Sequence, residues 1–223
     1  MGTYIGPKPV IHSVSEMAKG DSNGLLRGPM TLQRAARQPL EARFIGRGGQ
    51  GVISAAQLLA EAGVLEGRYV QAFPEFGAER SGAPISAYAR LSDEKIEIHS
   101  LIHSPAVIVV VDSSLSHTKG VASGLAAQGT LICNHDGTVS ELKALQGLPE
   151  GVRLFTLPAS KISLKTLGKD IPNTPMLGAM VRVTGAVRMD SIQAVLARRF
   201  KGSLLEKNAR ALKEGYEGVA GPG

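Results

Sequence analysis

The pattern of apolar and polar residues changes at about residue 40. Residues 1–40 carry glycine and proline throughout and show no sustained hydrophobic period, which predicts an extended N-terminal arm. From Glu41 onward, short β-branched runs alternate with segments of helical length and composition. This alternation predicts one α/β domain over residues 41–223: a three-layer, Rossmann-like fold with a mainly parallel sheet and a helical C-terminal portion.

Six apolar runs have the length and composition of strands. The run at 107–111 is continuously β-branched, which is typical of a strand covered on both faces. The predicted strands are 42–45, 69–73, 85–90, 107–111, 130–133 and 153–157, and the predicted helices before the C-terminal portion are 52–62 and 120–127. In the C-terminal portion, Asp190 and Ser203 each precede a polar residue by three positions, which predicts that they cap two helices.

A glycine-rich turn separates the first predicted strand from the first predicted helix. Small residues in such a turn let a phosphate approach the amides at the positive end of the helix. The candidate cofactor-binding residues are Gly46, Arg47, Gly48, Gly49, Gln50 and Gly51. A dinucleotide site also needs an acidic residue at the end of the second strand, and neither Glu66 nor Glu75 fits that place fully. Tight packing of strand against helix explains the glycines equally well.

Residues 73–84 form the densest stretch of polar residues and glycine. Glu75, Glu79 and Arg80 in this stretch are candidates for binding a ligand or docking a neighbouring chain. No histidine or nucleophile lies nearby to complete an acid–base mechanism, so a solvated or interface ion-pair cluster is the favoured interpretation. Asp112 follows a buried strand, where an aspartate commonly caps a helix. The sequence therefore assigns no catalytic residue.

Composition excludes several classes of site. The net charge of +6 comes from scattered Lys and Arg, and only 4% of residues are aromatic, so a nucleic-acid partner is not expected. The single cysteine, Cys133, excludes an iron–sulfur cluster or a cysteine zinc site held by this chain alone. His99 and His103 lie in a strand-like alternation that would separate them, so no metal site is predicted. With no membrane span or secretory signal, we expect a cytoplasmic protein.

Three motifs in order resemble the gamma subunit of pyruvate:ferredoxin oxidoreductase and its 2-oxoacid relatives. The motifs are residues 44–51, 76–84 and 173–179, and the resemblance runs from about Glu41 to about Gly218. It implies a substrate or interface loop that includes Ser81, and a second such segment at Asn173 and Thr174. The 79–84 loop is closer to the pyruvate type, which implies pyruvate or a similar small or aryl 2-oxoacid.

The resemblance also implies the setting in which the chain works. It implies an accessory subunit that binds no cofactor alone, in a complex with thiamine diphosphate, Mg, 4Fe-4S clusters and coenzyme A. The implied partners are alpha, beta and delta-type subunits and ferredoxin or another electron acceptor. Two alternatives stay open: a free-standing NAD(P)-binding Rossmann oxidoreductase, suggested by the glycine spacing, and a structural adaptor that only makes contacts.

Overall fold

The computed structural model describes residues 39–75, 84–98 and 100–221. The predicted N-terminal arm lies almost wholly outside the described residues, so it stays a prediction. Glu79, Arg80 and Ser81 of the predicted loop also lie outside them.

Six strands and seven helices follow one another along the described part of the chain. The strands are β1 (Leu40–Gly46), β2 (Tyr69–Glu75), β3 (Ile85–Ser92), β4 (Val107–Val110), β5 (Thr130–Asn134) and β6 (Arg153–Leu157). The helices are α1 (Val52–Leu65), α2 (Ser113–Ser116), α3 (Val139–Gln146), α4 (Ala159–Leu167), α5 (Asn173–Thr184), α6 (Met189–Arg199) and α7 (Gly202–Gly218).

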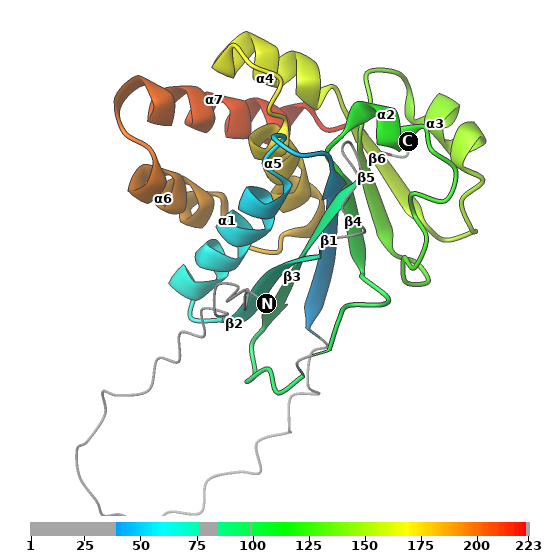
Figure 1. Cartoon of the computed structure of the whole chain (residues 1–223), viewed down its shortest axis with the longest axis horizontal. Coiled ribbons are helices and arrows are strands. Elements are labelled where there is room, and N and C mark those ends of the chain that lie inside the picture. The colour runs from blue at the N-terminus through cyan, green and yellow to red at the C-terminus, as the bar shows by residue number, and fades with distance from the viewer. Residues whose placement is uncertain (1–38, 76–83, 99, 222–223) are drawn as a thin grey trace, which may run out of the picture. The chain divides into compact units, whose positions relative to one another are not determined.

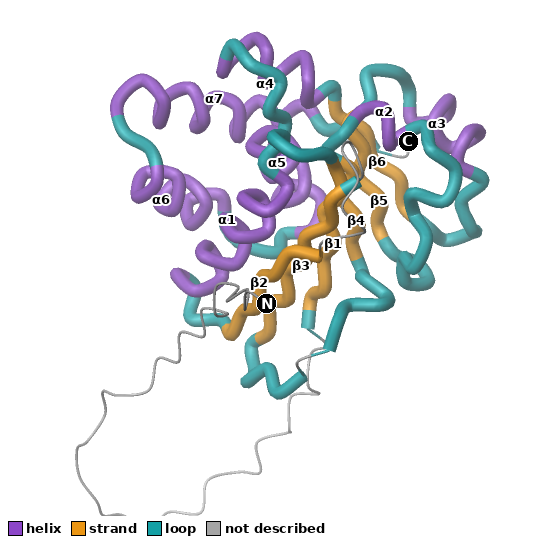
Figure 2. The backbone as a smooth tube through the Cα atoms, in the orientation of Figure 1, coloured by secondary structure: helices purple, strands orange, loops and turns teal. Residues whose placement is uncertain are grey.

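All six strands form one sheet in the order β2-β3-β1-β4-β5-β6 (Figure 2). The pairs β1–β4, β4–β5 and β5–β6 are parallel, whereas β3 runs antiparallel to both of its neighbours. Five strands therefore point the same way, which confirms the predicted mainly parallel sheet. The strand β3 itself was predicted, as residues 85–90, but its antiparallel direction and its place between β1 and β2 were not.

Helices cover the two faces of the sheet unequally. Helices α1 and α4–α7 lie on one side, while α2 and α3 lie on the other, beside β4–β6 (Figure 1). The side chains of β4 alternate between the two resulting cores, with Val109 in the larger core and Ile108 and Val110 in the smaller one. Every residue of β4 is buried for this reason. The predicted α/β class is confirmed.

Several local predictions were wrong. The predicted helix 120–127 is absent: residues 120–124 form turns because Gly120 and Gly124 adopt left-handed φ angles of 82° and 83°, which a right-handed helix does not accommodate. Residues 96–98 are not in a strand. Helices α6 and α7 begin earlier than predicted, so Asp190 and Ser203 lie inside their first turns and do not cap them.

Helices α5 and α7 cross at a backbone-to-backbone contact made possible by two glycines. A Cβ on Gly215 would lie 2.0 Å from the carbonyl oxygen of Pro175, and one on Gly178 would lie 2.2 Å from that of Leu212. Beside this crossing, the hydroxyl of Thr174 donates a 3.0 Å hydrogen bond to Oδ1 of Asn208. The crossing therefore fixes α5, and with it Asn173, against the rest of the domain.

Candidate functional site

The glycine turn links β1 to α1 at the carboxyl edge of the parallel strands. A Cβ on Gly46 would lie 2.6 Å from Cγ2 of Val52 and 3.3 Å from Cβ of Val111. Gly51 has a φ of 77°, and a Cβ there would lie 2.5 Å from Nδ2 of Asn173. Close packing and backbone conformation therefore account for these two glycines, and the fold brings Asn173 of the third motif against the first.

The tip of the turn is open to solvent. Gly48 and Gly49 are both exposed, and a Cβ on Gly48 would meet only Cδ1 of Ile85, at an ordinary distance of 3.8 Å. Helix α1 begins at Val52, and its N-cap residue, Gly51, offers no side-chain cap; the first turn contains no acidic residue. The helix thus presents its positive amino end beside an exposed glycine pair, an arrangement that suits an anion.

Gln50 and Asp112 hold the turn in place. Oε1 of Gln50 accepts a 2.8 Å hydrogen bond from the amide of Arg47, and Nε2 of Gln50 donates to Oδ2 of Asp112 at 2.7 Å. Asp112 also caps α2, because its Oδ1 accepts from the amide of Leu115 at 3.0 Å. One buried carboxylate therefore joins the ends of β1 and β4. The predicted capping role of Asp112 is confirmed, whereas its bond to Gln50 was missed.

The environment of Asp112 favours its ionised form. Burial raises the pKa of the carboxyl, but hydrogen bonds from Ser114, Gln50 and the Leu115 amide, together with the nearby charge of Arg47, outweigh burial and lower the pKa. Nε of Arg47 lies 3.6 Å from Oδ2 of Asp112, and its guanidinium also donates to Ser114 at 3.3 Å. Asp112 is therefore a charged anchor for the turn.

A second group of polar side chains lies at the same carboxyl edge of the sheet, at the end of β5. Nδ2 of Asn134 donates to the carbonyl oxygen of Val111 and to Oγ of Ser160, both at 2.9 Å, and Oδ1 of Asn134 accepts from the Ser160 amide at 3.2 Å. These bonds tie β5 to β4 and to α4. Sequence reasoning missed Asn134 and Ser160, although a polar residue directly after an apolar strand was a usable signal.

Glu75 is at the same edge but away from the turn. Antiparallel β3 separates β2 from β1, so Glu75 lies two strands from Gly46, or about 10 Å at the usual strand spacing. Its carboxylate accepts a 2.6 Å hydrogen bond from the hydroxyl of Tyr88. Burial and this bond raise the pKa of Tyr88 to about 12. The second strand therefore cannot bring an acidic residue beside the turn as the dinucleotide fold does.

The other predicted site residues are Thr174 and those of the 79–81 loop. Thr174 is only 1% exposed and bonded to Asn208, which gives it a packing contact between helices. The loop with Glu79, Arg80 and Ser81 is outside the described residues, but its flanks Glu75 and Ile85 both lie at the carboxyl edge, where Ile85 pairs with Gly46.

Other candidate chemistry is limited within the described ranges. Among those residues, no group of three His, Cys, Asp or Glu side chains is arranged to hold a metal ion. Cys133 is fully buried on β5, and burial raises the pKa of its thiol to about 12. None of the described helices combines the length and apolar character that crossing a membrane requires.

Comparison with known proteins gives consistent matches over the domain. The family model "Pyruvate ferredoxin/flavodoxin oxidoreductase" matches residues 41–218. The "Pyruvate/ketoisovalerate oxidoreductases common subunit gamma" of Pyrococcus abyssi is 45% identical over 179 residues, which cover 80% of this chain and 96% of the relative. The "Pyruvate synthase subunit PorC" of Thermotoga maritima is 40% identical over 188 residues, which cover 82% and 96% of the two chains.

A solved structure has the same fold. The crystal structure of pyruvate oxidoreductase subunit PORC from Thermotoga maritima superposes with a TM-score of 0.74 at 38% identity. The match covers 84% of this chain and all of the other. The relatives are therefore matched over nearly their whole length, and the extra length of this chain lies mainly before residue 41.

Proposed function

Since the chain belongs to the pyruvate ferredoxin/flavodoxin oxidoreductase family, we propose that it is the gamma-type accessory subunit of a complex that oxidatively decarboxylates a 2-oxoacid to an acyl-coenzyme A. The substrate is pyruvate or a similar small or aryl 2-oxoacid. The names of the relatives, which are subunits of pyruvate and ketoisovalerate oxidoreductases, support this proposal.

The redox cofactors belong to other subunits in this proposal. A 4Fe-4S cluster takes four cysteine thiolates, and the whole chain has one cysteine, which is buried. The clusters therefore lie on alpha, beta and delta-type partner subunits. We assign thiamine diphosphate with its Mg to the same subunits from the family resemblance, and the electrons pass to ferredoxin or another acceptor. The N-terminal arm contacts one of these partners, and the complex is cytoplasmic.

Within the complex, the glycine turn is proposed to bind a phosphate group of coenzyme A. The observation that carries this proposal is Gly48, an exposed glycine whose Cβ would meet only ordinary contacts. Packing explains Gly46 and Gly51, but it does not explain why a glycine is present at Gly48. An absent side chain beside an uncapped helix terminus leaves room for a phosphate to reach the amides of the turn.

The test is Gly48→Asp in the assembled complex. A new carboxylate beside the phosphate should raise the KM for coenzyme A by about tenfold or more, because like charges in contact cost several kcal/mol. The KM for the 2-oxoacid should not change. Ser203→Asp, at an exposed position of α7, adds the same charge elsewhere and should change neither constant. The isolated chain should show no turnover of a 2-oxoacid.

The same variants separate the alternatives. Tight binding of NAD(H) by the isolated chain, abolished by Gly48→Asp, would favour the free-standing Rossmann oxidoreductase. The place of Glu75, two strands from the turn, argues against that reading. If Gly48→Asp left both KM values and turnover of the complex unchanged, the structural adaptor would be the better description.

A further inference from the structure

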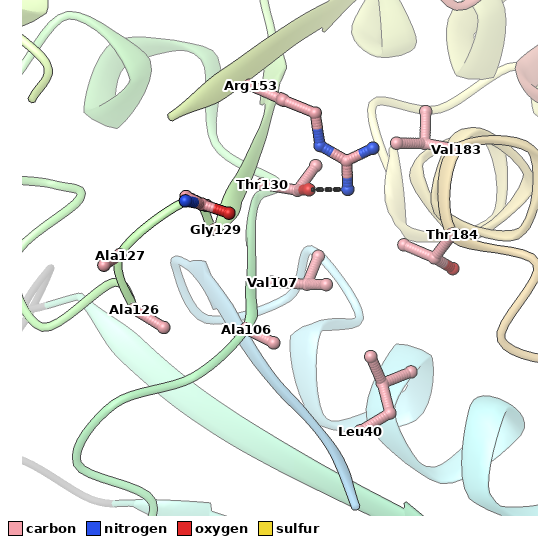
Figure 3. Close-up of a pocket in the computed structure, with 11 residues that line it drawn as sticks. Leu40, Ala106, Val107, Ala126, Ala127, Gly129, Thr130, Arg153, Val183 and Thr184 are labelled. Carbon is pink, nitrogen blue, oxygen red and sulfur yellow. Dashed lines mark hydrogen bonds between the residues drawn. The ribbon is translucent and has the colours of Figure 1, made fainter. Parts of the chain in front are cut away.

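A pocket lies at the edge of the sheet opposite the glycine turn, where the parallel strands β4, β5 and β6 begin. Its volume is about 290 Å³. Figure 3 shows that its walls come from the starts of these strands, the turn before β5 (residues 126–129) and the carboxyl end of α5. None of its residues belongs to the glycine turn or its hydrogen-bonded neighbours. The pocket is therefore separate from the site described above.

Arg153 is the charged group of this pocket. Its Nη2 donates a 2.8 Å hydrogen bond to Oγ1 of Thr130, and Figure 3 shows the guanidinium between Thr130 and Val183. Across the described ranges, no Asp or Glu lies within ion-pair distance of Arg153. A guanidinium has five N–H donors, so its one hydrogen bond to the Thr130 hydroxyl leaves other N–H groups of this cation available to an anion.

The rest of the lining combines small and aliphatic residues with the polar side chains of Gln128, Thr130 and Thr184. Its aliphatic surface comes from the half-buried Val183, beside the cation, and Leu40, at the far end of the pocket (Figure 3), while Val107 is only 3% exposed. Gln128 also lines the pocket, and it is the one non-glycine residue of the described part with a positive φ, at 59°. Such backbone strain collects at functional sites, where the surrounding structure maintains it. One cation beside the aliphatic side chain of Val183 fits an anion with a short apolar tail.

We propose that this pocket binds a small aliphatic carboxylate, with the carboxylate on Arg153 and the hydrocarbon chain running past Val183 towards Leu40. A planar carboxylate matches the planar fork of arginine, which lysine does not provide. The hydrocarbon chain gains from leaving water against the aliphatic walls. This site is independent of the proposed coenzyme A site, since the two lie at opposite edges of the sheet.

The experiment is calorimetric titration of the full-length chain with 3-methylbutanoate. We expect a dissociation constant in the millimolar range, with acetate about tenfold weaker because its tail buries less surface. The neutral 3-methylbutanamide and inorganic phosphate should bind at least tenfold more weakly than 3-methylbutanoate. Arg153→Gln should lose about tenfold or more in affinity, and Arg153→Lys should fall between Gln and the wild type.

Two control variants locate the binding. Arg210→Gln removes an exposed cation from α7 and should leave the affinity unchanged. Arg47→Gln removes the cation of the glycine turn and should also leave it unchanged, so failure here does not depend on failure of the coenzyme A proposal. Three results would overturn the pocket proposal. They are no binding of 3-methylbutanoate at tens of millimolar, equal binding of 3-methylbutanamide, and loss of binding in Arg47→Gln instead of Arg153→Gln.

Discussion

The crossing of α5 and α7 should tolerate no side chain at Gly215. In Gly215→Ala, the new Cβ would lie 2.0 Å from the carbonyl oxygen of Pro175 and 2.6 Å from its Cα. Both atoms are backbone, so no rotamer change relieves the clash and the helices must separate. Overpacking of this kind costs up to about 3 kcal/mol, while alanine recovers about 1 kcal/mol of helix propensity. The expected net loss of stability is about 2 kcal/mol.

Urea denaturation followed by circular dichroism measures this loss, which corresponds to a Tm lower by about 4–8 °C for a domain of this size. Gly218→Ala is the matched control on the same helix, because its Cβ would lie 3.4 Å from the flexible Cδ1 of Leu157. That variant should be unchanged or more stable by up to about 1 kcal/mol. Equal stability of Gly215→Ala and the wild type would refute the close crossing.

Two further predictions concern buried titratable groups. Asp112→Asn should cost about 1–3 kcal/mol at pH 7, because an amide replaces the carboxylate that accepts from Gln50 and Leu115. The folded-state pKa of Asp112 is lowered, so the stability that its carboxylate contributes is present above the unfolded-state pKa and is lost as pH falls. Urea titrations should therefore show the stability difference between wild type and Asp112→Asn shrinking below about pH 4. A stability difference that does not change with pH would contradict this. Cys133, whose pKa is raised to about 12, should resist a thiol reagent at pH 8 in the native protein and react in urea; rapid native reaction would contradict its burial.

The sequence predicted elements that depend on local pattern. The β-branched run of β4 and the glycine turn both express constraints within a few residues, and both were located correctly. The place of β3 in the sheet depends on which strands pair, and local pattern does not reveal this. Residues 76–84 separate β2 from β3, and they lack the two-residue turn signal from which an antiparallel hairpin is predicted.

The candidate site also combines features that are local in the sequence with features that depend on distant segments. The turn residues Gly46 to Gly51 were found from spacing alone, but the bond from Gln50 to Asp112 and the contact of Asn173 with Gly51 join segments far apart in the chain. Only the tertiary fold reveals that Gly51 is packed by Asn173 while Gly48 is open.

The burial of α5 sets a limit on how this domain can evolve. Every residue from Asn173 to Val181 is buried, so this part of the helix has no surface face on which substitutions would be neutral. Its first residue packs against the glycine turn, and its last residues, Val183 and Thr184, line the pocket at the other edge. A substitution in α5 would therefore disturb the packing of the glycine turn at one end or the pocket at the other, so we expect α5 to vary less among relatives than the exposed faces of the other helices.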